Sequence, residues 1–177
     1  MTAKTGRLPE VVELLQSSRA RLLDGVSSLS QAELDFTQSP DRWSIGEIPH
    51  HLQLIELSVA RLIGRLLEHA ARDGLGPDPR TESVLGSLDQ FAVESAGQKF
   101  VTPAASAPQK GCAKQVLLEG LAGSRAALLA VVEKAGAFDL SQLSFPHPAL
   151  GRLDGYQWLL FVGQHELRHL HQIERSR

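Results

Sequence analysis

The sequence contains a single cysteine, Cys112, and this scarcity limits the chemistry available to the chain. One cysteine forms no disulfide within the chain, which fits a reducing compartment. Cys112 follows Gly111 just ahead of a helical pattern, and no catalytic triad pattern surrounds it. We therefore interpret it as a small residue at a helix entry and not as a nucleophile.

The chain also lacks an excess of charge of one sign and a long hydrophobic run. Its formal net charge is −2, which argues against binding nucleic acid through a basic face. Residues 1–10 have no apolar run behind their positive charges, so no secretory signal is predicted. The apolar stretch at residues 158–163 is too short to span a bilayer. We expect a cytoplasmic protein that binds neither nucleic acid nor membrane.

Strand patterns are scarce as well. Alternating β-branched runs are nearly absent, whereas Leu, Ala, Glu and Arg recur at helical spacing. Hydrophobic residues make up 42% of the 177 residues, which suffices for one folded core. The sequence thus predicts a single domain over residues 1–177 with an all-α fold, a four-helix bundle.

Two helices are predicted in the first half of the chain. The first covers residues 9–23, with an apolar stripe that the small polar Ser18 interrupts. The second covers residues 44–72 and opens with a capping box, in which a serine precedes a glutamate by three positions. The pair in this helix is Ser44 with Glu47. A similar pair, Ser30 with Glu33, predicts a short helical turn over residues 30–35.

Two further helices are predicted after a long connection. Residues 73–111 are rich in Gly, Pro, Ser and Ala, with room for a short helix near residues 83–95. A connection of this length indicates a crossover and not a tight hairpin. The third helix covers residues 113–135, with an apolar side formed by Val116, Leu117, Leu121, Leu128, Leu129 and Val132. The fourth runs from residue 154 to the end of the chain.

Three of the seven histidines have a spacing that suggests a shared metal ion. His165 and His169 are four positions apart on a predicted helix, so their rings lie on one face, one turn apart. Two such imidazoles can bind one ion at ~2.1 Å. His51 lies on the apolar stripe of the second helix and can supply a third ligand from across the bundle. Three histidines leave positions open for water or substrate.

The same spacing has interpretations without a metal. An i, i+4 histidine pair often consists of two surface or core residues. His50 is rotated by about 100° from His51 and is expected to face outward or a neighbouring helix. We expect His171 to be exposed and interpret His69 and His147 as structural.

The segment from His165 to His169 also matches the letters H-E-x-x-H of zinc metalloproteases. In those enzymes the glutamate activates water beside the zinc ion. Here the chain ends soon after His169, and no strand pattern precedes the helix to hold a peptide substrate. We therefore favour other chemistry over a protease.

Two blocks of sequence resemble the DinB-like superfamily, and its YfiT-like branch in particular. The first block resembles the pattern W-S-x-x-E-x-x-x-H-L and begins at Trp43. The second resembles H-P-x-x-G-x-L, then Q-W, then H-x-x-R-H-x-x-Q, and begins at His147. The blocks occur in the family's order and extend over nearly the whole chain.

The resemblance implies a four-helix bundle with a long crossover and a divalent metal ion, usually zinc or nickel, bound by three histidines. Carried over by motif, these ligands are His51, His165 and His169. Characterised relatives include thiol S-transferases that use bacillithiol or glutathione, and mycothiol-dependent isomerases. The family often forms homodimers. The crossover at residues 98–110 resembles the family's variable loop, where substrate contacts would lie.

Three more residues are candidates for supporting the site, each with a structural alternative. Glu47 could orient the His51 imidazole, although we favour a role in the helix cap. Arg168 could pair with a substrate carboxylate or with an acidic residue of the bundle. Gln172 could form a hydrogen bond near the site or join neighbouring helices.

Three functions follow from these features. The first is a metal-dependent enzyme acting on small molecules, either a transferase that uses a low-molecular-weight thiol or a hydrolase. The second is a metal-containing binding or stress-response module without turnover. The third is a helical dimerisation scaffold whose histidines are incidental.

Overall fold

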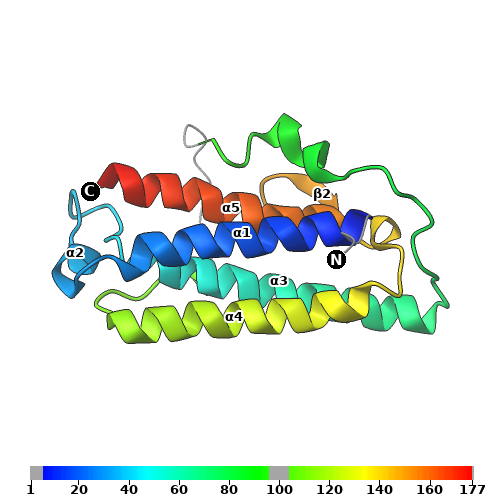
Figure 1. The fold of residues 1–177 in the computed structure, drawn as a ribbon, viewed down its shortest axis with the longest axis horizontal. Helices are drawn as coiled ribbons and strands as arrows, with labels where there is room; N and C mark the ends of the chain where they lie inside the picture. Colours follow the sequence, from blue (N-terminus) through cyan, green and yellow to red (C-terminus); the bar gives the residue numbers. More distant parts are fainter. Residues whose placement is uncertain (1–5, 96–103, 177) are drawn as a thin grey trace, which may run out of the picture.

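Four long helices lie side by side in the computed structural model, which describes residues 6–95 and 104–176 (Figure 1). They are α1 (Arg7–Ser27), α3 (Glu47–Arg72), α4 (Lys114–Ala135) and α5 (Gly155–Ser176). Helix α1 packs along α5, and α3 packs along α4. The predicted all-α four-helix bundle is confirmed.

Side-chain caps define several of the helix starts. Ser30 precedes the short helix α2 (Gln31–Asp35) and forms a complete capping box with Glu33. Ser44 and Glu47 exchange the same pair of bonds in the turn that leads into α3. Helix α1 extends beyond the predicted residues 9–23 at both ends. Its added residues include Val26, which is buried in the core.

The crossover between α3 and α4 carries the chain back along the length of the bundle, so that α3 and α4 point in the same direction (Figure 1). It contains two short 3-10 helices, η1 (Leu85–Phe91) and η2 (Ala104–Ser106). The former packs on α5 and the latter on α3. The predicted substrate loop at residues 98–110 lies partly outside the described residues.

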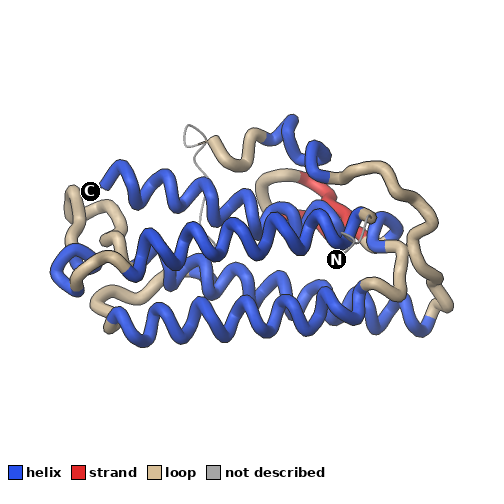
Figure 2. Tube along the Cα trace, in the orientation of Figure 1, coloured by secondary structure: helices blue, strands red, loops and turns tan. Residues whose placement is uncertain are grey.

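A small β-hairpin, which the sequence patterns did not reveal, precedes α5. Strand β1 (Ser144–His147) pairs antiparallel with β2 (Gly151–Asp154) (Figure 2). Four-residue strands are too short for the alternation that identifies strands in a sequence. Gly151 has a φ of 79°, in the left-handed region that glycine adopts without strain. The indole Nε1–H of Trp158 donates to the Phe145 carbonyl oxygen and ties the hairpin to α5.

Two hydrophobic clusters fill the bundle. On each long helix, buried polar or charged residues separate the members of one cluster from those of the other. On α4, for example, Leu121 belongs to one cluster and Leu128 to the other, while Ser124 and Arg125 between them are buried and polar. Val116, predicted on the apolar side of this helix, is instead 58% exposed.

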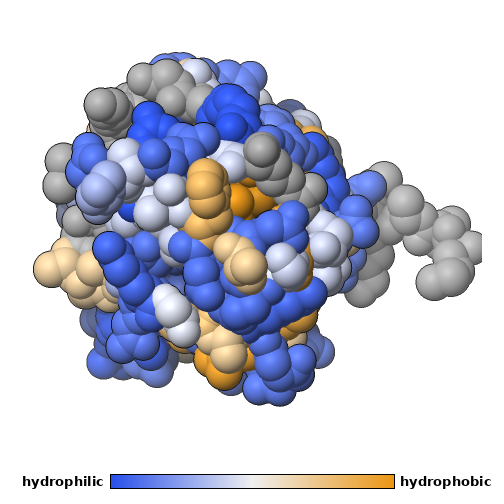
Figure 3. Space-filling model, turned by 90° about the vertical axis from the view of Figure 1, so that its left-hand side faces the viewer, coloured by the Kyte–Doolittle hydropathy of each residue, from blue (hydrophilic) through white to orange (hydrophobic). Residues whose placement is uncertain are grey.

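Helix α4 is long and apolar enough to cross a membrane by length and composition alone. Core helices of soluble bundles meet the same criterion, and α4 packs along α3 as one of the four helices here. Viewed from the end that carries α2, the surface is mostly hydrophilic, with hydrophobic side chains exposed in small groups (Figure 3).

Candidate metal centre

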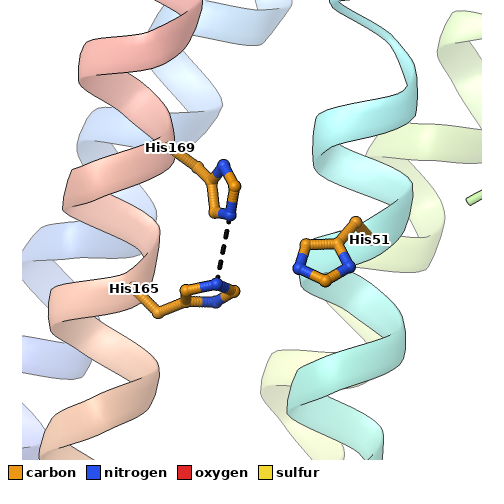
Figure 4. Close-up of side chains that lie close together, drawn as sticks. All are labelled: His51, His165 and His169. Carbon is orange, nitrogen blue, oxygen red and sulfur yellow. Dashed lines mark hydrogen bonds between the residues drawn. The ribbon is translucent and has the colours of Figure 1, made fainter. Parts of the chain in front are cut away.

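Three histidines from two helices converge inside the bundle. His51 projects from α3 toward His165 and His169 on α5 (Figure 4), and one nitrogen of each ring lies within 4.8 Å of the others. The Nε2 atoms of His165 and His169 are 3.1 Å apart. The three residues are 4%, 7% and 8% exposed, respectively. The structure thus brings together all three ligands predicted from the sequence.

Hydrogen bonds fix the tautomers of two of these rings. The Nδ1 atom of His51 lies 2.9 Å from the Ser106 carbonyl oxygen, which can only accept, so this nitrogen carries the proton. The Nδ1 atom of His169 lies 2.9 Å from Oε1 of Gln172 and donates to it. In a neutral imidazole the second nitrogen then bears a lone pair. Both Nε2 atoms are therefore available as metal ligands.

His165 has an unsatisfied nitrogen, because its buried Nδ1 has no hydrogen-bond partner among the described residues. Its Nε2 atom faces the Nε2 lone pair of His169. Two nitrogens each about 2.1 Å from a common ion lie roughly 3.0–3.4 Å apart, which matches this approach. The donor set of three imidazoles suits zinc, nickel, copper and iron. The residues present therefore fit a divalent metal ion.

Burial keeps the three imidazoles neutral. It lowers the pKa of His51, and the carbonyl of Ser106 only partly opposes this shift. Burial, with a smaller contribution from the charge of His51, lowers the pKa of His169 to about 3. The pKa of His165 also lies well below its usual value, again mainly through burial. Neutral rings at pH 7 have the lone pairs that metal binding requires.

A cavity of about 440 Å³ borders the three rings. Its walls are mainly apolar and aromatic, and the Phe161 ring stacks on His165 with centroids 5.0 Å apart. The Trp43 ring lies 4.9 Å from that of His51. Pockets of this size, with an apolar lining and a few polar groups, typically bind small molecules.

The three candidate supporting residues lie in different surroundings. Gln172 contacts His169 and lines the cavity. Arg168 also lines the cavity, and its guanidinium donates to the carbonyl oxygens of Val93 and Ser95. The carboxylate of Glu47 accepts from the Ser44 amide at 2.8 Å, as a cap does.

Glu166, the glutamate of the H-E-x-x-H letters, belongs to a buried ion-pair network. Its Oε1 atom accepts from Arg19 Nε at 2.7 Å, and its Oε2 atom accepts from Arg125 Nη2 at 2.8 Å. The Ser18 hydroxyl donates to Oε2 at 2.6 Å. Both arginines also pair with Glu56, at 2.6 Å each. A carboxylate held by these donors does not serve as the general base of a metalloprotease.

The remaining histidines lie outside the cluster. His50 accepts a hydrogen bond from the Gln109 amide at 2.8 Å, and His69 is exposed and contacts Arg72. His171, expected to be exposed, is half-buried. His147, interpreted from the sequence as structural, lines the cavity. Its place in the H-P-x-x-G-x-L block was the signal that could have identified it.

Comparison with known proteins agrees with this fold. A family model described as the DinB superfamily matches residues 14–173. The uncharacterized protein YuaE of Bacillus subtilis (strain 168) is 22% identical over 164 residues, which are 92% of this chain and 94% of YuaE. The crystal structure of TT2238, a four-helix bundle protein, superposes with a TM-score of 0.64 at 24% identity. That match covers 95% of this chain and 98% of TT2238 and shows a shared fold. Since the family model spans nearly all of the sequence, the chain belongs to the DinB superfamily.

Proposed function

We propose that this protein is a metal-dependent enzyme that acts on small molecules. One observation carries the proposal: three neutral imidazoles converge at the wall of a mainly apolar cavity. Without a ligand this buried cluster would be unfavourable, because His51 and His169 both carry a lone pair on Nε2 and His165 Nε2 can donate a proton to only one of them. A bound divalent ion offsets that unfavourable term and gives the cavity a reactive centre.

In this proposal His51, His165 and His169 hold the ion through their Nε2 atoms. Ser106 and Gln172 orient two of the rings, as partners of metal-binding histidines generally do. Aromatic side chains, among them Trp43 and Phe161, form part of the cavity wall beside the ion site. When bound, a divalent ion supplies Lewis acidity, which makes a water or a thiol nucleophilic near neutral pH.

The reaction class we propose is transfer to a low-molecular-weight thiol or hydrolysis of a small molecule, with zinc or nickel as the ion. The imidazole donor set supports both metals, and membership of the DinB superfamily supports a metal site. We further propose that the protein acts in the cytoplasm as a homodimer. Its single cysteine fits a reducing compartment.

The second candidate function is a metal-containing module without turnover. The same three histidines support it, since a metal site with an adjacent cavity also binds ligands without reaction.

A turnover assay separates the two functions. Protein with measured metal content is incubated with thiols and an electrophile, and separately with ester and amide substrates. The enzyme proposal predicts turnover that a chelator removes and added metal restores. Absence of turnover across these substrates favours the module.

Matched histidine variants test whether the metal depends on this site. His51→Ala should abolish both bound metal and turnover, whereas His50→Ala, one position away and outside the cluster, should retain both. If His51→Ala keeps its metal, both the enzyme and the module are excluded. The remaining interpretation is the scaffold with incidental histidines.

A further inference from the structure

The cavity carries a second polar centre, at His147 in the β-hairpin. The His147 ring lines the cavity and packs against Trp158 and Phe161, with centroids 5.0 and 4.6 Å away. Phe161 in turn stacks on His165. One aromatic ring therefore separates His147 from the histidine cluster.

The hairpin turn fixes the tautomer of His147. The backbone amides of Ala149 and Leu150 donate to its Nδ1 atom at 3.1 and 3.2 Å. A nitrogen that accepts these bonds carries no proton, so in the neutral ring the proton resides on Nε2. Burial lowers the pKa of His147, which keeps the ring neutral. No acceptor for Nε2–H occurs among the described residues.

The charges around the cavity favour an anion. None of the described lining residues is acidic, and Arg168 contributes a positive charge. Three neutral imidazoles add no negative charge, so a divalent ion held by them would keep its full charge. A ligand with a negatively charged oxygen would therefore be attracted, and its apolar part would pack against the aromatic walls.

We propose that His147 is a specificity-determining residue, whose Nε2–H donates to the carboxylate of a small organic acid with an apolar body bound in this cavity. The inference rests on the proposed function in one respect, since it takes the cavity to be the substrate site. A hydrogen bond between a neutral donor and a carboxylate is stronger than one to a neutral acceptor. His147 would therefore select the acid over its amide.

Two substitutions at His147 distinguish loss of the Nε2–H donor from loss of the hydrogen bonds that Nδ1 accepts in the hairpin turn. The side-chain oxygen of His147→Asn can still accept from the turn amides, but this variant has no donor at the Nε2 position. His147→Gln has the opposite character, because its amide nitrogen reaches the Nε2 position. The test uses phenylacetate and phenylacetamide as probes. Tryptophan fluorescence reports their binding, because both tryptophans of the chain, Trp43 and Trp158, line the cavity.

The wild-type protein should bind phenylacetate more tightly than phenylacetamide. His147→Asn should weaken phenylacetate binding by roughly 10-fold or more, the range for a hydrogen bond to a charged group. Its melting temperature and zinc content should match those of the wild type, and His147→Gln should recover part of the affinity. Equal binding of the two probes by the wild type would overturn the proposal, as would wild-type affinity in His147→Asn.

Zinc content is measured in every sample, and each titration is repeated after chelation. Failure to bind either zinc or nickel would contradict the metal-dependent function alone. The preference for phenylacetate would then be judged on the metal-free protein, in which His147 and Arg168 still face the cavity. Loss of the His147 effect in protein that binds zinc would contradict the specificity role alone.

Discussion

Two groups of buried polar side chains lie next to each other in this bundle and differ in how fully they are satisfied. In the ion-pair network, two arginines and two glutamates balance each other, and each carboxylate oxygen has a donor. In the histidine cluster, three neutral rings face one another beside a cavity, and two of them carry Nε2 lone pairs for which His165 Nε2 offers a single proton. Glu166 and His165 are adjacent in sequence yet belong to different groups.

The difference separates a structural role from a functional one. A self-contained network links four helices and needs nothing from outside the chain. An incomplete cluster requires a further group, and the adjacent cavity gives that group access. Substitutions in the network should therefore alter stability, whereas substitutions in the cluster should alter binding.

The largest expected effect on stability is in the network. Glu166→Gln leaves Arg19 and Arg125 with one carboxylate between them, and breaking a buried pair costs about 3–5 kcal/mol. Urea denaturation of metal-free protein measures the free energy of unfolding. Glu174→Gln, at an exposed site on the same helix, is the control and should change little. A stable Glu166→Gln variant would show that the network contributes little to stability.

A smaller effect, on metal affinity, is expected at Gln172. Removing its Oε1 acceptor by Gln172→Ala frees the His169 ring to rotate, and such losses typically weaken metal binding by about 10- to 100-fold. Competition with a chromogenic chelator measures the affinity. His171→Ala, on the neighbouring position, should keep wild-type affinity. The same affinity in Gln172→Ala as in the wild type would show that this hydrogen bond does not orient the ring.

The metal-free protein should lose stability as the pH falls. The pKa of His169 is about 3 in the folded state, whereas it is near 6.5 in the unfolded chain, so the unfolded chain binds more protons between these values. Stability is therefore highest above pH 6.5. Below it, stability declines by at most about 1.4 kcal/mol per pH unit for this group. Thermal unfolding between pH 5 and 8 tests this, and His169→Gln should flatten the decline. An unchanged slope in that variant would assign the pH dependence to other groups.

The smallest effect is expected at Glu47. Because its carboxylate caps the turn before α3, Glu47→Gln should cost about 1 kcal/mol of folding stability at most. Metal affinity should stay at the wild-type value, because the partner of His51 Nδ1 is the Ser106 carbonyl. A fall in metal affinity without a change in stability would instead support the alternative that Glu47 orients His51.

The sequence predicted those features that depend on local spacing. The paired caps at Ser30 and Ser44 and the histidine pair on α5 each lie within one helical turn, so a pattern of three or four positions is sufficient to identify them. His51 also lay on a predicted apolar stripe, which directed it toward the bundle interior.

Features that depend on distant parts of the chain were missed. Arg19 and Glu166 are separated by 147 positions, and charged residues on helices are usually exposed, so the network had no local signal. The contact of His51 with Ser106 uses a backbone carbonyl, which every residue possesses. The cavity position of His147 depends on a hairpin whose strands are too short to recognise.

X-ray absorption spectroscopy of the purified protein tests most directly whether three imidazole nitrogens hold one divalent ion. Together with elemental analysis, it measures the number of ions per chain and the atoms bound to them. We predict one ion with three nitrogen ligands at about 2.0–2.1 Å. Absence of metal after supplementation with zinc and nickel would contradict the account, as would a coordination sphere without imidazole nitrogen.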